Sequence, residues 1–480
     1  MNKEPQRKEQ STFVTIFAIW NSMVGGGLVS HPWAFSESGI LLSLIINFAV
    51  MMVCFYTCNL IMKWGKGDDD FSVTMQRFFG AKGHYASTIT TMAILYGGAI
   101  IYYQLLTQTL FPFVVGIIDI ISGTYTPSVS TEVDFTKFSL AWTSIIIFIP
   151  LYLIVCMKDR SIFIKMSSFG VLFIIIQIMF VVVIFFYSIS NTKYSFTWIE
   201  SENIVEGQNI AMFKSNFQSL TGMLAAGYYL HQLGLPVILD NKNQENNTRD
   251  IFWGYFLVFL TYCIIGVCGF LGFSGEYFQG APIMQNILNM FATSHPIATF
   301  IRVCSFTQIF SVYPLLFHVV RVNFTRTFFE NGLEGKGFYL YNLLASLPWA
   351  ILAIWYPRVG NLLGYAGGVV GLFTIYLLPV ALHLKRSWME INQPLRLKKL
   401  ESRAVKEYEV YNGGSSVNQN KDDLTEKLIE EENENKTMKK EGITNGRDIE
   451  KKSNSQLWVV IWLDSWAILF GVVIFILQFI

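Results

Sequence analysis

The 480-residue chain is 52% hydrophobic and 14% charged, and its formal net charge is +1. This balance excludes an ordinary soluble domain, so we expect the lipid bilayer, and no nucleic acid, to surround the chain. Neither a GxxxxGK[ST] motif nor an HExxH motif occurs in it, and we therefore do not expect an enzyme.

Apolar runs long enough to cross a bilayer recur along the whole chain. About 20 residues of helix cross the ~30 Å hydrocarbon layer. The sequence therefore predicts an all-α polytopic membrane protein with eleven transmembrane helices. The eleven runs cover 13–35, 40–62, 86–120, 138–157, 162–189, 212–235, 251–275, 293–320, 337–356, 361–383 and 457–479.

Lysine and arginine are concentrated in alternate connections between these runs. With the short tail 1–12 placed in the cytosol, the cytosolic segments hold 30 of the 35 Lys and Arg residues. Short cytosolic loops carry most of the positive charge in membrane proteins, so this orientation is the one we expect. An odd number of spans then places Ile480 outside, at a plasma membrane or a vacuolar or lysosomal membrane.

The first run contains an interruption, "WNSMVGGGLVSHP", from Trp20 to Pro32. Glycine costs about 1 kcal/mol per helix position relative to alanine, and proline about 3 kcal/mol. Three consecutive glycines and a proline therefore predict a break in this helix.

The sixth run, Phe213 to Pro236, is interrupted in a similar way, at Thr221-Gly222 and again at 225–227. Spans one and six are corresponding members of two five-helix sets, 13–189 and 212–384, and the second set must insert upside down. Interrupted spans at corresponding positions of inverted repeats indicate a transporter site near the midplane. A LeuT-like core over 13–384 is therefore the predicted architecture.

Unwound backbone in a membrane is tolerated where it faces protein or a water-filled cavity, and there its N–H and C=O groups can bind a ligand. The N–H groups of Gly25, Gly26 and Gly27 suit a carboxylate. Carbonyls freed near 219–222 would accept hydrogen bonds from an ammonium group, and the two together describe an α-amino acid. The alternative is that these glycines only allow close helix packing.

Several motifs resemble those of the amino acid/auxin permease family, which includes the sodium-coupled neutral amino acid transporters. The first-span pattern N-x-x-x-G-x-G-[IV]-L-x-x-P is similar to Asn21, Gly25, Gly27, Leu28 and Pro32, with Val29 in place of the usual leucine. Further resemblance lies in "FSVTMQRFFGAKG" (71–83), "AGYYLHQLGLP" with His231 and Pro236, Tyr313-Pro314 with Arg321, and "LLGYAGGVVGLFTIYLLPVALHLK". It covers roughly 12–386.

The resemblance implies a symporter: secondary active amino acid transport driven by a sodium or proton gradient, with no other cofactor. It also implies first-span substrate contacts from Asn21, Ser22, Met23, Gly25 and Gly27, with Gly26 between them. A hydroxyl of the eighth span would complete a sodium site, for which Ser311 and then Thr307 are the candidates. The substrates we expect first are small neutral amino acids, because the two breaks contain no acidic residue.

Ionisable and aromatic side chains in the spans give further candidates. His231 follows the sixth-span break and can exchange a proton near neutrality, although a bracing role is equally consistent. We expect His31 to lie near the outer interface and Asp464 to make helix contacts outside the ten-helix core. Among the aromatic residues, Tyr228 is the expected pocket residue, with Thr221 and Gly222 beside it.

Residues 385–456 are rich in Lys, Glu and Asn, a composition typical of disorder. We expect a cytosolic insertion there, able to contact cytosolic proteins, before the last span at 457–480. A receptor that binds an amino acid and signals through cytosolic segments is the alternative function. An ion channel would need rings of charged or carbonyl groups, which the sequence does not suggest.

Overall fold

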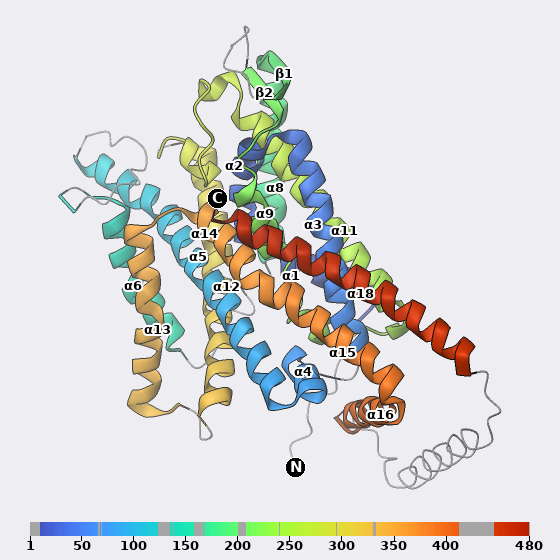
Figure 1. Ribbon diagram of the computed structural model, residues 1–480. Coiled ribbons are helices and arrows are strands. Elements are labelled where there is room, and N and C mark those ends of the chain that lie inside the picture. The colour runs from blue at the N-terminus through green and yellow to red at the C-terminus, as the bar shows by residue number, and fades with distance from the viewer. Residues whose placement is uncertain are drawn as a thin grey trace.

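The computed structural model describes residues 10–65, 68, 70–122, 135–136, 138–157, 166, 169–199, 208–239, 241–293, 295–329, 333–411 and 446–479. The fold is helical, with one small sheet (Figure 1). In the first half, the elements are α1 (Thr12–Met23), η1 (Gly26–Ser30), α2 (His31–Ser38), α3 (Ile40–Trp64), α4 (Phe71–Phe79), α5 (Ala81–Ser122), α6 (Leu140–Val155), α8 (Gly170–Asn191), β1 (Tyr194–Ile199) and β2 (Gln208–Phe213). In the second half, they are α9 (Gln218–Gly227), α10 (Gly234–Leu239), η2 (Gln244–Asn246), α11 (Asn247–Phe273), η3 (Glu276–Phe278), η4 (Ile287–Met290), α12 (Pro296–Phe328), α13 (Gly335–Trp355), α14 (Val359–Tyr365), η5 (Ala366–Val370), η6 (Leu372–Leu377), α15 (Leu378–Asn392), α16 (Pro394–Tyr411) and α18 (Gly446–Leu477).

Eight helices in the described part of the chain are long and apolar enough to cross a membrane. A ninth span is formed by Thr12–Met23 and Gly26–Ser38, which meet at an angle of 51°. At the two remaining predicted positions the helices are shorter, namely α6 and the pair α9 and α10. The all-α membrane fold is confirmed, and the count of eleven spans stays a prediction.

The predicted break in the first span is confirmed. The α1 helix ends at Met23, and Val24 and Gly25 are extended, with φ −80° and −123°. A short η1 turn follows before α2 resumes the helix with Pro32 in its first turn, where proline is well tolerated. The glycines therefore separate two half-helices.

The break in the sixth span is displaced from the predicted position. Residues 218–227 form the regular helix α9, and the break covers 228–233, ahead of α10. The expectation that carbonyls near 219–222 are freed was wrong, because those residues lie inside α9. The residues that break the helix contain neither glycine nor proline.

The helices around the two breaks form one packed bundle. The α5 helix packs along α12, and α11 packs against α8, α2 and α1. Figure 1 shows the parallel sheet β1–β2, paired from Tyr194 with Gln208 onward, at one end of the bundle and α4 and α16 at the other. The α18 helix crosses the front of the bundle beside α15.

The structure differs from the expected disorder of 385–456 at both ends of that stretch. The α15 helix continues to Asn392, α16 follows at 394–411, and α18 begins at Gly446. Buried Leu397 and the partly buried Leu400 pack α16 against the core. The composition of all 72 residues taken together does not reveal these two apolar contacts. Residues 412–445 lie outside the described residues.

Candidate functional site

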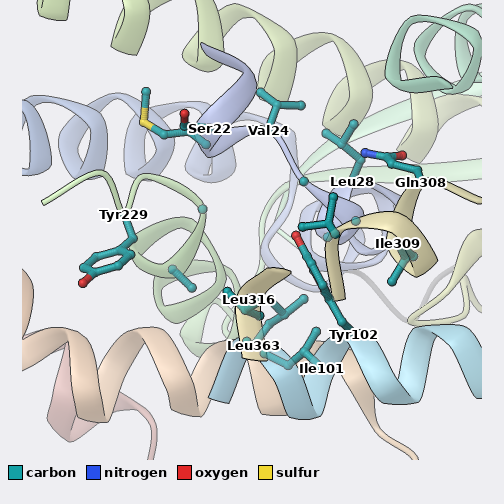
Figure 2. Close-up of a pocket in the computed structure, with 18 of the residues that line it drawn as sticks. Ser22, Val24, Leu28, Ile101, Tyr102, Tyr229, Gln308, Ile309, Leu316 and Leu363 are labelled. Atoms are coloured by element: carbon teal, nitrogen blue, oxygen red, sulfur yellow. The ribbon is translucent and has the colours of Figure 1, made fainter. Parts of the chain in front are cut away.

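A cavity of about 380 Å³ lies at the break in the first span (Figure 2). Its size falls in the range of small-molecule sites. The walls come from α1, η1, α2, α5, α8, α9, α11, α12, α14 and η5. Among the lining residues in the described part of the chain, none is Asp, Glu, Lys or Arg. A neutral or zwitterionic ligand therefore suits this cavity better than one with a net charge.

All six predicted first-span contacts line the cavity, namely Asn21, Ser22, Met23, Gly25, Gly26 and Gly27. Asn21 and Ser22 are exposed, and the Ser22 hydroxyl donates to the Ala18 carbonyl at 2.7 Å. In the described part of the chain, the N–H groups of residues 25–27 donate no backbone hydrogen bond outside regular helices. The N–H group of the following residue, Leu28, donates to the Gly25 carbonyl at 3.4 Å. The break thus presents backbone donors at the cavity wall.

The three glycines differ in the space beside them. A Cβ added at Gly25 would lie 2.7 Å from the Tyr102 hydroxyl, and one at Gly26 would lie 3.1 Å from the Ile309 side chain. At Gly27 the nearest atom would be Leu363 Cδ1, at an ordinary 3.7 Å. In Figure 2, Tyr102 rises from α5 with its hydroxyl directed toward the first-span break. Glycine at 25 is therefore required for close approach rather than for an unusual backbone angle.

Tyr262 of α11 connects the two breaks. Its hydroxyl lies 3.2 Å from the Met23 carbonyl oxygen, at the end of α1, and 3.1 Å from the Gly227 carbonyl oxygen, at the end of α9. One hydroxyl hydrogen can donate to only one of these carbonyls at a time. The two half-helix ends therefore meet at a single shared donor, which sequence reasoning missed because Tyr262 lies in an uninterrupted apolar helix.

His31 lines the cavity and is buried; the expectation that it lies at the outer interface was wrong. Its ring contacts the Tyr262 ring at a tilt of 33°, with centroids 4.2 Å apart, and its Nδ1 lies 3.0 Å from the Gly27 carbonyl oxygen. Because a carbonyl only accepts, Nδ1 carries the hydrogen, and in the neutral ring Nε2 is an acceptor. Nε2 is buried without a hydrogen-bond partner in the described structure, so it is an available ligand contact.

The three predicted sixth-span residues do not line the cavity. The Thr221 hydroxyl donates to the Gln218 carbonyl at 2.7 Å, and the Tyr228 hydroxyl donates to Asn47 Oδ1 at 2.6 Å. Gly222 packs against α14, where an added Cβ would overlap the Gly364 carbonyl group. Gly222 therefore lies where α9 and α14 pack closely.

Other residues of this segment take their place. Met223, Ala226, Gly227 and Tyr229 line the cavity. Tyr229, and not the predicted Tyr228, is the tyrosine of this segment that lines the cavity. The Tyr228 hydroxyl is bonded to Asn47 of α3 instead.

The predicted coupling residues also lie away from the cavity lining. The Ser311 hydroxyl donates to the Gln308 carbonyl at 2.7 Å, and the Thr307 hydroxyl donates to the Val303 carbonyl at 2.8 Å. His231 is buried with Nε2 2.9 Å from Thr57 Oγ1. The role of the three residues in coupling stays a prediction.

Gln308 is the polar residue of α12 that does line the cavity. Its Oε1 accepts a hydrogen bond from Gln177 Nε2 of α8 at 2.9 Å, and Figure 2 shows its side chain among the lining residues. An amide in the middle of an apolar span was the available sequence signal for this residue.

Comparison with solved structures supports the fold. Mhp1 in its inward facing conformation is similar to this chain with a TM-score of 0.50 and 13% sequence identity, over 78% of this chain and 79% of Mhp1. This likeness confirms the LeuT-like architecture. The repeat boundaries 13–189 and 212–384 stay predictions.

Relatives with curated names agree with the sequence motifs. Neutral amino acid transporter 9 of Danio rerio is 26% identical, over 78% of this chain and 74% of its own. The sodium-coupled neutral amino acid transporter 9 homolog of Caenorhabditis elegans is also 26% identical, over 79% and 69%. These relatives are transporters, not enzymes. The family model described as "Transmembrane amino acid transporter protein" matches residues 8–404, and the chain belongs to this family.

Proposed function

We propose that this protein is a secondary active transporter that moves neutral amino acids across a membrane by alternating access, coupled to a sodium or proton gradient. The observation that carries the proposal is the cavity at the first-span break, where unwound backbone, the end of α9 and Tyr262 meet. Broken helices at the centre of a LeuT-like bundle form substrate sites near the membrane midplane.

The polar part of an amino acid has complementary groups at this break. The substrate carboxylate would accept hydrogen bonds from the N–H groups of Gly25 and Gly27, close to the positive end of the following half-helix. The ammonium group would donate to His31 Nε2, which lacks a partner, and to the carbonyl of Met23 or Gly227 that Tyr262 leaves free. This assignment gives each charge of the zwitterion two hydrogen-bonding groups of the complementary kind.

The rest of the cavity is suited to an apolar substrate side chain. Its walls include Ile94, Leu95, Ile174, Met223 and Leu316. A volume of about 380 Å³ exceeds what the smallest amino acids would fill. Small neutral amino acids were the first substrates expected from the sequence, and the cavity supports extending the proposal to larger aliphatic ones.

The coupling ion is proposed as sodium or a proton, with a different residue for each. Donation by the Ser311 hydroxyl to the Gln308 carbonyl leaves its lone pairs available for sodium. The Thr57 hydroxyl donates to the Val53 or Cys54 carbonyl, so it accepts from His231 Nε2–H. His231 Nδ1 is then a buried acceptor without a described partner, and it is the atom that would take a proton.

The orientation follows from the positive charge of the loops. We place α4 and α16 in the cytosol and the C-terminus outside, in a plasma membrane or a vacuolar or lysosomal membrane. A receptor that signals through cytosolic segments is the second candidate function, and α16 is the described cytosolic element that could contact a partner protein.

Uptake into proteoliposomes tests the proposal. Purified protein would be reconstituted and offered a panel of radiolabelled amino acids, with sodium and proton gradients imposed separately. We expect concentrative uptake of a neutral amino acid under one of the two gradients. Specific binding of an amino acid without uptake under either gradient would instead favour the receptor.

A further inference from the structure

The chain turns sharply where α15 ends, at the end of the bundle that we place in the cytosol. The α15 helix ends at Asn392, Gln393 has φ −141° and ψ 53°, and α16 begins at Pro394. Figure 1 shows α16 turned away from the direction of α15 at this end of the bundle. Because α15 completes the apolar span Val359–Asn392, the turn lies at the membrane surface. We call residues 385–402 the α15–α16 elbow.

Large apolar side chains of α15 are exposed just before the turn. Trp388 is 43% exposed and Ile391 is 39% exposed, and residues three positions apart lie on one face of a helix. Lys385 Nζ lies 4.5 Å from the centre of the Trp388 ring. Tryptophan is concentrated at the level of the lipid headgroups, and lysine extends along apolar surface to keep its ammonium group in water. This face of α15 therefore suits lipid acyl chains.

The first turns of α16 present cations on their exposed side. Buried Leu397 and the partly buried Leu400 hold this helix against the core and so fix its rotation. Arg396 and Lys399 are exposed and lie three positions apart, close enough on a helix to act on one ligand. Both follow Trp388 and Ile391 closely in the chain, across the turn.

The charge of the elbow is not balanced within the elbow itself. It contains five basic residues and two acidic ones, Glu390 and Glu401. Both carboxylates pair with Arg386, at 2.6 Å and 3.4 Å. The Arg396 guanidinium donates to the Gln393 amide oxygen at 3.1 Å, which carries no charge. Among the described residues, no carboxylate of the elbow is left for Arg396 or Lys399, so an anion from outside the elbow suits them.

We propose that the elbow binds an anionic phospholipid of the adjacent leaflet. The phosphate-bearing headgroup accepts hydrogen bonds from Arg396 and Lys399, and an acyl chain lies against Trp388 and Ile391. Basic residues on a helix beside a membrane span attract anionic lipids. The exposed apolar face favours a lipid over a soluble anion or an acidic protein, neither of which needs that face. This inference does not rest on the identity of the transported substrate.

Quenching of tryptophan fluorescence by brominated acyl chains tests which lipids touch Trp388. The full-length protein would be reconstituted in phosphatidylcholine vesicles that contain brominated phosphatidylserine or, at equal mole fraction, brominated phosphatidylcholine. Subtracting the signal of Trp388→Phe isolates this residue among the 12 tryptophans. At low salt we expect phosphatidylserine to associate about fivefold more strongly, with a smaller preference at high salt. Equal quenching by the two lipids at low salt would overturn the proposal.

Charge-removing variants locate the preference on α16. Arg396→Gln combined with Lys399→Gln should abolish the preference for phosphatidylserine, and each single variant should reduce it. Both side chains are exposed, so the fold should be retained, and thermal unfolding checks this. Lys336→Gln is the matched control, since Lys336 is an exposed lysine at the start of α13, on the side that we also place in the cytosol.

Two results would contradict a lipid site at the elbow. An equal loss of preference in Lys336→Gln would mean that the lipid responds to the general charge of the surface. Loss of the preference on addition of inorganic phosphate, at constant ionic strength, would mean that Arg396 and Lys399 bind a soluble anion. We expect neither, because inorganic phosphate has no acyl chain to place against Trp388 and Ile391.

Discussion

The hydroxyl oxygen of Tyr262 lies 3.2 Å from the carbonyl oxygen of Met23, the last residue of α1. The same hydroxyl lies 3.1 Å from the Gly227 carbonyl oxygen at the end of α9. A tyrosine of a continuous helix thus holds the ends of two interrupted helices. Any movement that separates the two ends must break one of these contacts, and a substrate ammonium group can occupy the carbonyl that Tyr262 releases.

Replacing Tyr262 by phenylalanine should weaken substrate binding by about five-fold, because one hydrogen bond at the wall of the cavity is lost. Tyr255→Phe is the matched control: its hydroxyl donates to the Tyr228 carbonyl at 3.1 Å, from the same helix, but it does not line the cavity. Equilibrium binding of a radiolabelled substrate measures the effect. If Tyr262→Phe and Tyr255→Phe bound the substrate with equal affinity, Tyr262 would have no specific role in substrate binding.

Enlarging Gly25 should reduce uptake more than enlarging Gly27. An alanine Cβ at Gly25 meets the Tyr102 hydroxyl at 2.7 Å, whereas at Gly27 it meets Leu363 at 3.7 Å. We expect Gly25→Ala to reduce uptake about tenfold or more and Gly27→Ala to be milder. Valine at either position should abolish uptake by filling the carboxylate space.

The combination of Gly25→Ala with Tyr102→Phe identifies the cause of the loss at Gly25. Removing the hydroxyl opens the space that the new Cβ needs, so uptake should recover in part. Tyr102→Phe alone is the control. No recovery in the double variant would mean that the clash with Tyr102 is not what limits transport.

Gly222→Ala should destabilise the protein by about 1 to 3 kcal/mol through overpacking, since the new Cβ overlaps the Gly364 carbonyl group. Gly116→Ala on α5, where nothing lies within 4 Å of the added Cβ, is the matched control. Thermal unfolding in detergent and substrate affinity of the folded fraction are the two measurements. If Gly222→Ala had a normal melting temperature but no longer bound the substrate, Gly222 would belong to the substrate site after all.

The first break could be predicted from the sequence because its cause is local. Three glycines and a nearby proline each disfavour continuous helix, whatever surrounds them. The sixth-span break could not be placed, since residues 228–233 contain no such residue. There, the carbonyls of Gly227 and Tyr228 are bonded by hydroxyls of Tyr262 and Tyr255, about 30 positions away. Single-sequence patterns do not contain contacts of this kind.

Shortening 412–445 to a flexible linker should leave substrate affinity within about twofold, because its composition is that of a solvated segment. The whole stretch 385–456 cannot be deleted, because α16 packs against the core through Leu397 and Leu400 and has to be retained. Binding to the shortened protein is the measurement. A folded deletion variant that no longer binds substrate would contradict the prediction.

The last prediction separates the two coupling ions through Ser311 and His231. If sodium drives transport, Ser311→Ala removes a buried hydroxyl ligand and raises the half-saturating sodium concentration. If protons drive transport, His231→Gln removes the Nδ1 acceptor and flattens the pH profile of uptake. In the wild type, the His231 ring is held by the Thr57 hydroxyl, 2.9 Å from Nε2. Thr307→Ala tests the second candidate on α12, and we expect a smaller effect because its hydroxyl bonds the Val303 carbonyl on a less buried face. All three variants belong in one proteoliposome assay with sodium and pH varied independently. Unchanged ion dependence in both Ser311→Ala and His231→Gln would exclude both residues from coupling. The next candidates would then be His31 and Gln308, a histidine and an amide that line the cavity itself.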